Sequence, residues 1–125
     1  MAIKHRNIFV VDDDEMMAQM LSDHLQKKPF NKVSIFHTGE DCIAHLAENP
    51  DVVILDYQLD SVVENAGNGL QILEKIKKLD KSVTVIMLSS QDQYGKALQT
   101  IQKGALEYVV KNNDAFKRID VILGD

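Results

Sequence analysis

Cysteine, proline and tryptophan are scarce in this chain, which has one, two and none of them among its 125 residues. The single cysteine, Cys42, cannot form an internal disulfide, and this fits a reducing compartment. No apolar run approaches the roughly 20 residues of a membrane helix, and the run after the basic start is too short for a signal-peptide core. We therefore expect a cytoplasmic protein that does not enter a membrane.

Basic residues are outnumbered by acidic ones. The chain has 14 lysines and arginines and 19 aspartates and glutamates, which gives a net charge of -5. Phosphate backbones attract basic faces, so we expect no direct binding to nucleic acid. Hydrophobic residues make up 45% of the chain, which is enough for a core without a disulfide or a structural metal. The length is that of one compact unit, and we expect a single domain over residues 1–125.

Short aliphatic segments alternate with amphipathic ones along the whole chain. The predicted strands are Ile8–Val11, Val33–Phe36, Val52–Leu55, Val83–Leu88 and Glu107–Val110. The predicted helices cover about Glu15–Lys27, Glu40–Glu48, Leu70–Leu79, Tyr94–Gln102 and Asp114–Leu123. Nearly continuous apolar strands are typical of a parallel sheet with helices on both faces. With right-handed crossovers, the pattern predicts an α/β fold with one five-stranded parallel sheet.

Polar residues stand directly after the predicted strands, where open α/β sheets bind their ligands. They are Asp12, Asp13, Asp14, Asp56, Ser89, Ser90 and Lys111. Carboxylates gathered at one edge raise each other's pKa unless a cation is bound, and Mg²⁺ uses carboxylates together with phosphate oxygens. A carboxylate can also be the nucleophile that forms an aspartyl-phosphate. This edge is therefore a candidate site for Mg²⁺-dependent phosphoryl transfer.

Four segments, IFVVDDD, DVVILD, VIMLSS and GALEYVVKN, resemble the signature segments of response-regulator receiver domains, in that family's order and near its spacing. The resemblance covers nearly the whole chain. It implies a (βα)5 flavodoxin-like fold with strand order 2-1-3-4-5. It also implies a phosphorylation-activated switch of a two-component system, which receives its phosphoryl group from a sensor histidine kinase, a phosphotransfer protein or a small phosphodonor. Such a switch catalyses its own phosphorylation and dephosphorylation and is not a conventional enzyme.

The resemblance also assigns roles by position. The implied Mg²⁺ ligands are Asp12, Asp13, Asp56 and the backbone carbonyl of Gln58. Asp56 matches the phosphoacceptor, Ser89 the hydroxyl that bonds a phosphoryl oxygen, and Lys111 the lysine that pairs with it. Tyr108 matches the aromatic residue whose rotamer reports the switch. Asp14 is expected instead at the start of the first helix, where the helix dipole favours a negative charge.

This sequence departs from the family pattern in two places. About five extra residues lie within Asp60–Gly69, either as a tolerated surface insertion or as a flap that controls access to Asp56. We expect the segment from about Ser61 to Asn68 to be mobile. The second departure is Asn112, which stands where the family usually has a proline, and we expect a trans bond between Lys111 and Asn112.

Three other functions account less well for these residues. A phosphohydrolase of the haloacid-dehalogenase type would also use an aspartate nucleophile and Mg²⁺, but it needs an acid two residues later, where Gln58 stands. A nucleotide-binding domain would need a glycine-rich loop after the first strand. Here the first strand is followed by Asp12, Asp13 and Asp14 instead. A module that keeps the fold without taking phosphate is disfavoured by the acidic set, Ser89 and Lys111. For the receiver, an effector or a second copy is expected to dock on the surface formed by residues 94–102, 107–110 and 114–123.

Overall fold

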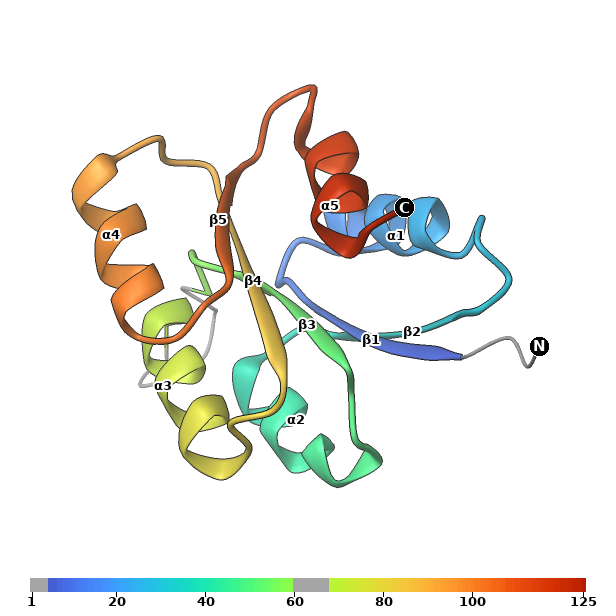
Figure 1. Ribbon diagram of the computed structural model, residues 1–125, viewed down its shortest axis with the longest axis horizontal. Helices are drawn as coiled ribbons and strands as arrows, with labels where there is room; N and C mark the ends of the chain where they lie inside the picture. Colours follow the sequence, from blue (N-terminus) through green and yellow to red (C-terminus); the bar gives the residue numbers. More distant parts are fainter. Residues whose placement is uncertain (1–4, 60–67) are drawn as a thin grey trace.

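The five strands of the computed structural model form one parallel sheet in the order β2-β1-β3-β4-β5, as the resemblance implied. The strands are β1 (Arg6–Val11), β2 (Asn31–Phe36), β3 (Val52–Asp56), β4 (Thr84–Ser89) and β5 (Glu107–Val110). The helices are α1 (Glu15–Leu25), α2 (Gly39–Ala44), α3 (Gly69–Leu79), α4 (Tyr94–Gln102) and α5 (Ala115–Leu123), with a 3-10 turn η1 (Leu46–Glu48) after α2. Figure 1 shows α1 and α5 on one side of the sheet and α2, α3 and α4 on the other.

The structure describes residues 5–59 and 68–125. Of the segment Asp60–Gly69, only Asn68 and Gly69 are described, so the predictions of a mobile loop and of a flap lie outside the described residues. Among the helices that are described, none is long and apolar enough to cross a membrane. The cytoplasmic location stays a prediction.

Two apolar layers, one on each face of the sheet, form the core. Along β3, Val53 and Leu55 pack into the layer with α2 and α3, whereas Val52 and Ile54 pack into the layer with α1 and α5. Successive side chains of a strand point to opposite faces, so a strand covered on both sides has no polar face. This explains the uninterrupted apolar runs, and it means that the first polar residue after a run marks the edge of the sheet.

Hydrogen bonds at the first residues of the helices fix the loops that join them to the carboxyl ends of the strands. The side chain of Asp14 caps α1 by accepting a hydrogen bond from the backbone N–H of Met17, as expected. Asn68 and Gln71 form a capping box at the start of α3. The helix predicted over Glu40–Glu48 is not continuous, because its second half is the separate turn η1, which ends at Asn49 in the left-handed region with φ 58°.

Helix α4 has few anchors to the rest of the molecule. Thr100 is its only fully buried residue, and within the described part of the chain the Thr100 hydroxyl has no hydrogen-bond partner. The N-cap residue, Gln93, makes no side-chain hydrogen bond to the helix. Tyr94 and Leu98 are exposed on its surface. Helix α4 is therefore weakly anchored to the rest of the molecule.

Candidate active site at the carboxyl edge of the sheet

Three carboxylates meet where β1 and β3 end. The two strands are paired with Val11 beside Leu55, so the residues that follow them lie side by side. Carboxylate oxygens of Asp12, Asp13 and Asp56 all lie within 4.8 Å of one another. Asp12 and Asp56 are each only 2% exposed, whereas Asp13 is exposed. The predicted acidic cluster is confirmed in its geometry.

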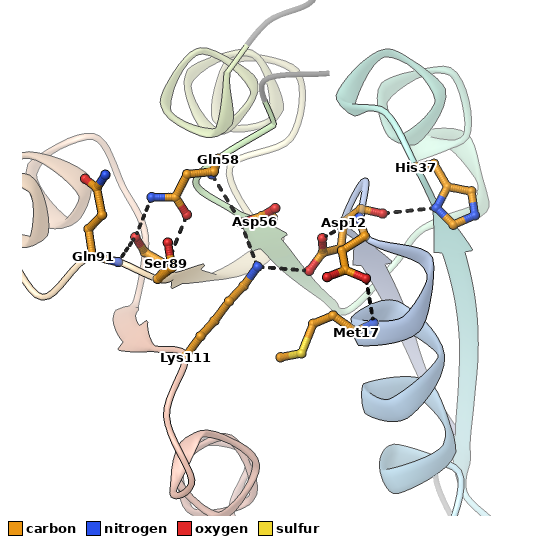
Figure 2. A network of polar contacts seen from close by, with 10 residues as sticks. Asp12, Met17, His37, Asp56, Gln58, Ser89, Gln91 and Lys111 are labelled. Carbon is orange, nitrogen blue, oxygen red and sulfur yellow. Dashed lines mark hydrogen bonds and ion pairs between the residues drawn. The ribbon is translucent and has the colours of Figure 1, made fainter. Parts of the chain in front are cut away.

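Lys111 reaches this cluster from the end of β5, two strands away from β3 (Figure 2). Its Nζ lies 3.3 Å from Asp12 Oδ2 and 3.2 Å from Asp56 Oδ1. Burial lowers the pKa of the lysine, but the carboxylates of Asp56 and Asp12 outweigh burial, so the pKa of Lys111 is raised. The ammonium group therefore stays charged and bridges the two buried carboxylates.

The positive charge of Lys111 is not enough to keep the pKa of Asp56 at its ordinary value. Burial, and then the charge of Asp12, raise the pKa of Asp56 from 3.8 to about 7, although Lys111 and the backbone N–H of Gln58 act in the opposite direction. A shift of this size marks a carboxylate that lacks positive charge. The three clustered carboxylates of Asp12, Asp13 and Asp56 suit a hard divalent cation such as Mg²⁺.

Ser89 lies at the end of β4, is fully buried, and is held by two donors. Its Oγ accepts a hydrogen bond from Gln58 Nε2 at 3.1 Å and another from the backbone N–H of Gln91 at 3.1 Å. The Oε1 of Gln58 in turn accepts from the backbone N–H of Ser90 at 3.2 Å. Figure 2 shows this bridge beside the Lys111–Asp56 contact. The sequence had indicated only the backbone carbonyl of Gln58, and the role of its side chain was missed.

Tyr108 is tied to the same loop as Ser89. Its hydroxyl donates to the backbone carbonyl of Gln91 at 2.6 Å, and its ring lies edge-on to Tyr57 with the centroids 6.1 Å apart. Burial raises the pKa of Tyr108, against a smaller opposing effect of Ser89. The ammonium group of Lys96, on α4, lies 5.4 Å from the centroid of the Tyr57 ring. Contacts thus run from the site toward α4 and β5.

The backbone around the site is closely packed. A Cβ on Gly69 would lie 2.6 Å from the Cα of Tyr57, so only glycine fits where α3 starts beside the end of β3. His37, for which the sequence indicated no function, contacts the backbone carbonyl of Asp12 through Nδ1 at 3.0 Å. No cis peptide bond occurs among the described residues, so the bond between Lys111 and Asn112 is trans, as predicted.

Comparison with known proteins agrees with this fold and this cluster. A family model described as the response regulator receiver domain matches residues 8–122. The chemotaxis protein CheY of Bacillus subtilis is 30% identical over 119 residues, which are 94% of each chain. The receiver domain of NtrX from Brucella abortus has a TM-score of 0.80 and 25% identity, with 94% of this chain and 95% of that chain covered.

A further neighbour in fold is CheY in a CheX–CheY–BeF3–Mg complex from Borrelia burgdorferi, with a TM-score of 0.80, 24% identity, and 95% of this chain and 87% of that chain covered. The family model spans nearly the whole chain, and the strand order is the one the resemblance implied. The chain therefore belongs to the response-regulator receiver domains, the CheY-like phosphorylation-activated switches of two-component signalling.

Proposed function

We propose that the chain is one receiver domain over residues 1–125 and that Asp56 is its phosphoacceptor. The observation that carries this proposal is the contact of the buried Asp56 carboxylate with Lys111, beside the oxygens of Asp12 and Asp13. In the reaction, a carboxylate oxygen of Asp56 forms a bond to phosphorus. The bond from phosphorus to the donor breaks at the same time, and the donor leaves as imidazole from a phosphohistidine or as acetate from acetyl phosphate.

The neighbouring residues have distinct roles in this proposal. Mg²⁺ would be held by the carboxylates of Asp12, Asp13 and Asp56 and by the backbone carbonyl of Gln58. When bound, the ion supplies positive charge for the carboxylates and for the phosphoryl oxygens. Lys111 pairs with one phosphoryl oxygen, and its present place on Asp56 Oδ1 leaves it close to that position. Ser89 donates its hydroxyl hydrogen to another phosphoryl oxygen.

The proposed function implies two kinds of partner, one that supplies the phosphoryl group and one that responds to phosphorylation. A sensor histidine kinase, a phosphotransfer protein or a small phosphodonor supplies the phosphoryl group. The new charge then acts on the loop after β4, where Gln91 is bonded to Ser89 and to Tyr108 of β5, next to the weakly anchored α4. We propose that a downstream effector or a second copy of the chain binds at α4, β5 and α5, where Tyr94, Leu98 and other apolar side chains are exposed.

Phosphohydrolase activity on other molecules is the alternative, and the side chain of Gln58 argues against it. That chemistry needs an acid two residues after the nucleophile to protonate the leaving group. Gln58 is an amide, and its side chain is engaged with Ser89 and Ser90. The protein is therefore proposed to catalyse only its own phosphorylation and dephosphorylation.

Acetyl phosphate with Mg²⁺, followed by intact-mass measurement, tests the proposal. We expect one added phosphoryl group on the wild type and none on Asp56→Asn. Asp14→Asn is the matched control, because Asp14 lies next to the cluster but caps α1, a role that asparagine also fills. Equal modification of Asp56→Asn would show that the acceptor is another residue. Continuous release of phosphate from several small phosphate esters would show a hydrolase.

A further inference from the structure

Gln58 is the only residue of the β3–α3 side that the described structure shows bonded to the end of β4 through its side chain. Its Nε2 donates to Ser89 Oγ, and its Oε1 accepts from the backbone N–H of Ser90. The bond to Ser90 fixes which end of the amide faces Ser89, because a backbone N–H can only be a donor. The amide is thus oriented, and its N–H group is aimed at the hydroxyl oxygen.

These contacts use both acceptor positions of the Ser89 hydroxyl. A hydroxyl oxygen can accept two hydrogen bonds, and here they come from Gln58 and from the backbone of Gln91. The donor on Gln91 belongs to the same loop as Ser89 and can move with it. The donor on Gln58 belongs to the loop after β3, so the Gln58–Ser89 bond is kept only while the end of β4 stays in place against that loop.

We propose that the side chain of Gln58 is a positioning residue that holds Ser89 in the unphosphorylated state, and that Ser89 gives up the hydrogen bond from Gln58 when it moves to donate its own hydroxyl hydrogen to the phosphoryl group. This inference rests on the proposed function of Asp56 and Ser89. It adds that Gln58 sets the position of the switch equilibrium, because its bond is made in one state and lost in the other. Loss of that bond favours the phosphorylated conformation.

Binding of beryllofluoride, a phosphoryl analogue, in the presence of Mg²⁺ tests the inference. Gln58→Met removes both hydrogen bonds and keeps a side chain of similar length, and it also keeps the backbone carbonyl. We expect Gln58→Met to bind the analogue about three- to tenfold more tightly than the wild type, the effect of one neutral hydrogen bond on the equilibrium. Gln19→Ala is the matched control, because Gln19 is exposed on α1 and its side chain bonds to Asp23 of the same helix. Unchanged or weaker binding by Gln58→Met would overturn the inference.

Two further measurements separate this role from a merely structural one. In the absence of the analogue, the amide resonances of Tyr108 and Val110 in Gln58→Met should move toward their positions in the analogue-bound wild type. In an Ser89→Ala background, Gln58→Met should give almost no additional gain in affinity. Resonances that do not move, or a gain that persists without the Ser89 hydroxyl, would show that Gln58 does not act through Ser89.

The outcomes also separate this inference from the proposed function. A wild type that binds no beryllofluoride and takes no phosphoryl group would overturn the proposed function, and the role of Gln58 with it. A wild type that binds the analogue, with a Gln58→Met variant that binds it equally, would overturn only the role of Gln58.

Discussion

The buried carboxylate of Asp56 should make the metal-free protein less stable as the pH rises, and Asp56→Asn should remove this effect. The pKa of Asp56 is raised from 3.8 to about 7 by burial and by Asp12. One pKa unit corresponds to about 1.4 kcal/mol, so ionisation of Asp56 in the folded state costs at most about 4 kcal/mol relative to the unfolded chain. Water and counterions that enter the metal-free site screen the charge, and we expect about 2 kcal/mol to remain.

The direction of the effect follows from which state binds more protons. Because the folded pKa of Asp56 lies above the unfolded one, the folded protein holds its proton over a pH range in which the unfolded chain has lost it. The associated stability is fully present below about pH 3.8 and is lost as the pH rises through about 7. A neutral asparagine has no such dependence, so Asp56→Asn should gain on the wild type across this window.

Urea unfolding in the presence of a chelator, at pH 4.5 and at pH 8, measures this difference. We expect the free energy of unfolding of Asp56→Asn, relative to the wild type, to increase by about 2 kcal/mol between the two pH values. Asp14→Asn serves as the control, and its difference from the wild type should change much less. A difference between Asp56→Asn and the wild type that is independent of pH would refute the electrostatic account of the site.

Three other substitutions test separate features of the structure. Mg²⁺ at a hundred times its dissociation constant should raise the free energy of unfolding of the wild type by about 2.7 kcal/mol, and thermal melts should show this gain largely lost in Asp13→Ala. Thr100→Val should stabilise the protein by about 1 kcal/mol in urea unfolding, because it removes a buried hydroxyl that has no partner among the described residues; lower stability would contradict this. Gly69→Ala should destabilise by about 1–3 kcal/mol, because its Cβ would lie 2.6 Å from the Cα of Tyr57, and wild-type stability would show that α3 can move away.

The sheet was predictable from the sequence because both of its faces are covered. A strand such as β3 needs apolar residues at every position, and such runs stand out against amphipathic helices. The order of the strands in the sheet could not be predicted from the apolar runs alone. It was taken from the resemblance to receiver domains. The break between α2 and η1 depends on His45, whose φ of -106° departs from a helical value. No residue preference at that position signals such a break, and Pro50 only limits how far a helix could continue beyond it.

The acidic cluster was predictable for a related reason, since carboxyl ends of adjacent parallel strands share an edge. Asp12 and Asp56 follow paired strands, and their approach needs no knowledge of rotamers. The Gln58–Ser89 bond is different, because it depends on how far two loops reach and on which way an amide side chain turns. The only signal was that Gln58 stands two residues after Asp56.

The groups that would meet a phosphoryl group already have partners in this structure. The ammonium of Lys111 bridges Asp12 and Asp56, and the hydroxyl of Ser89 is held by Gln58. In the proposed reaction these partners are exchanged, so each new contact is offset by the loss of an old one. The net free energy is then a small difference between similar terms, as it is for hydrogen bonds in general. A small difference of this kind keeps both states accessible, and it lets a change at Gln58, which does not itself meet the phosphoryl group, shift the equilibrium between them.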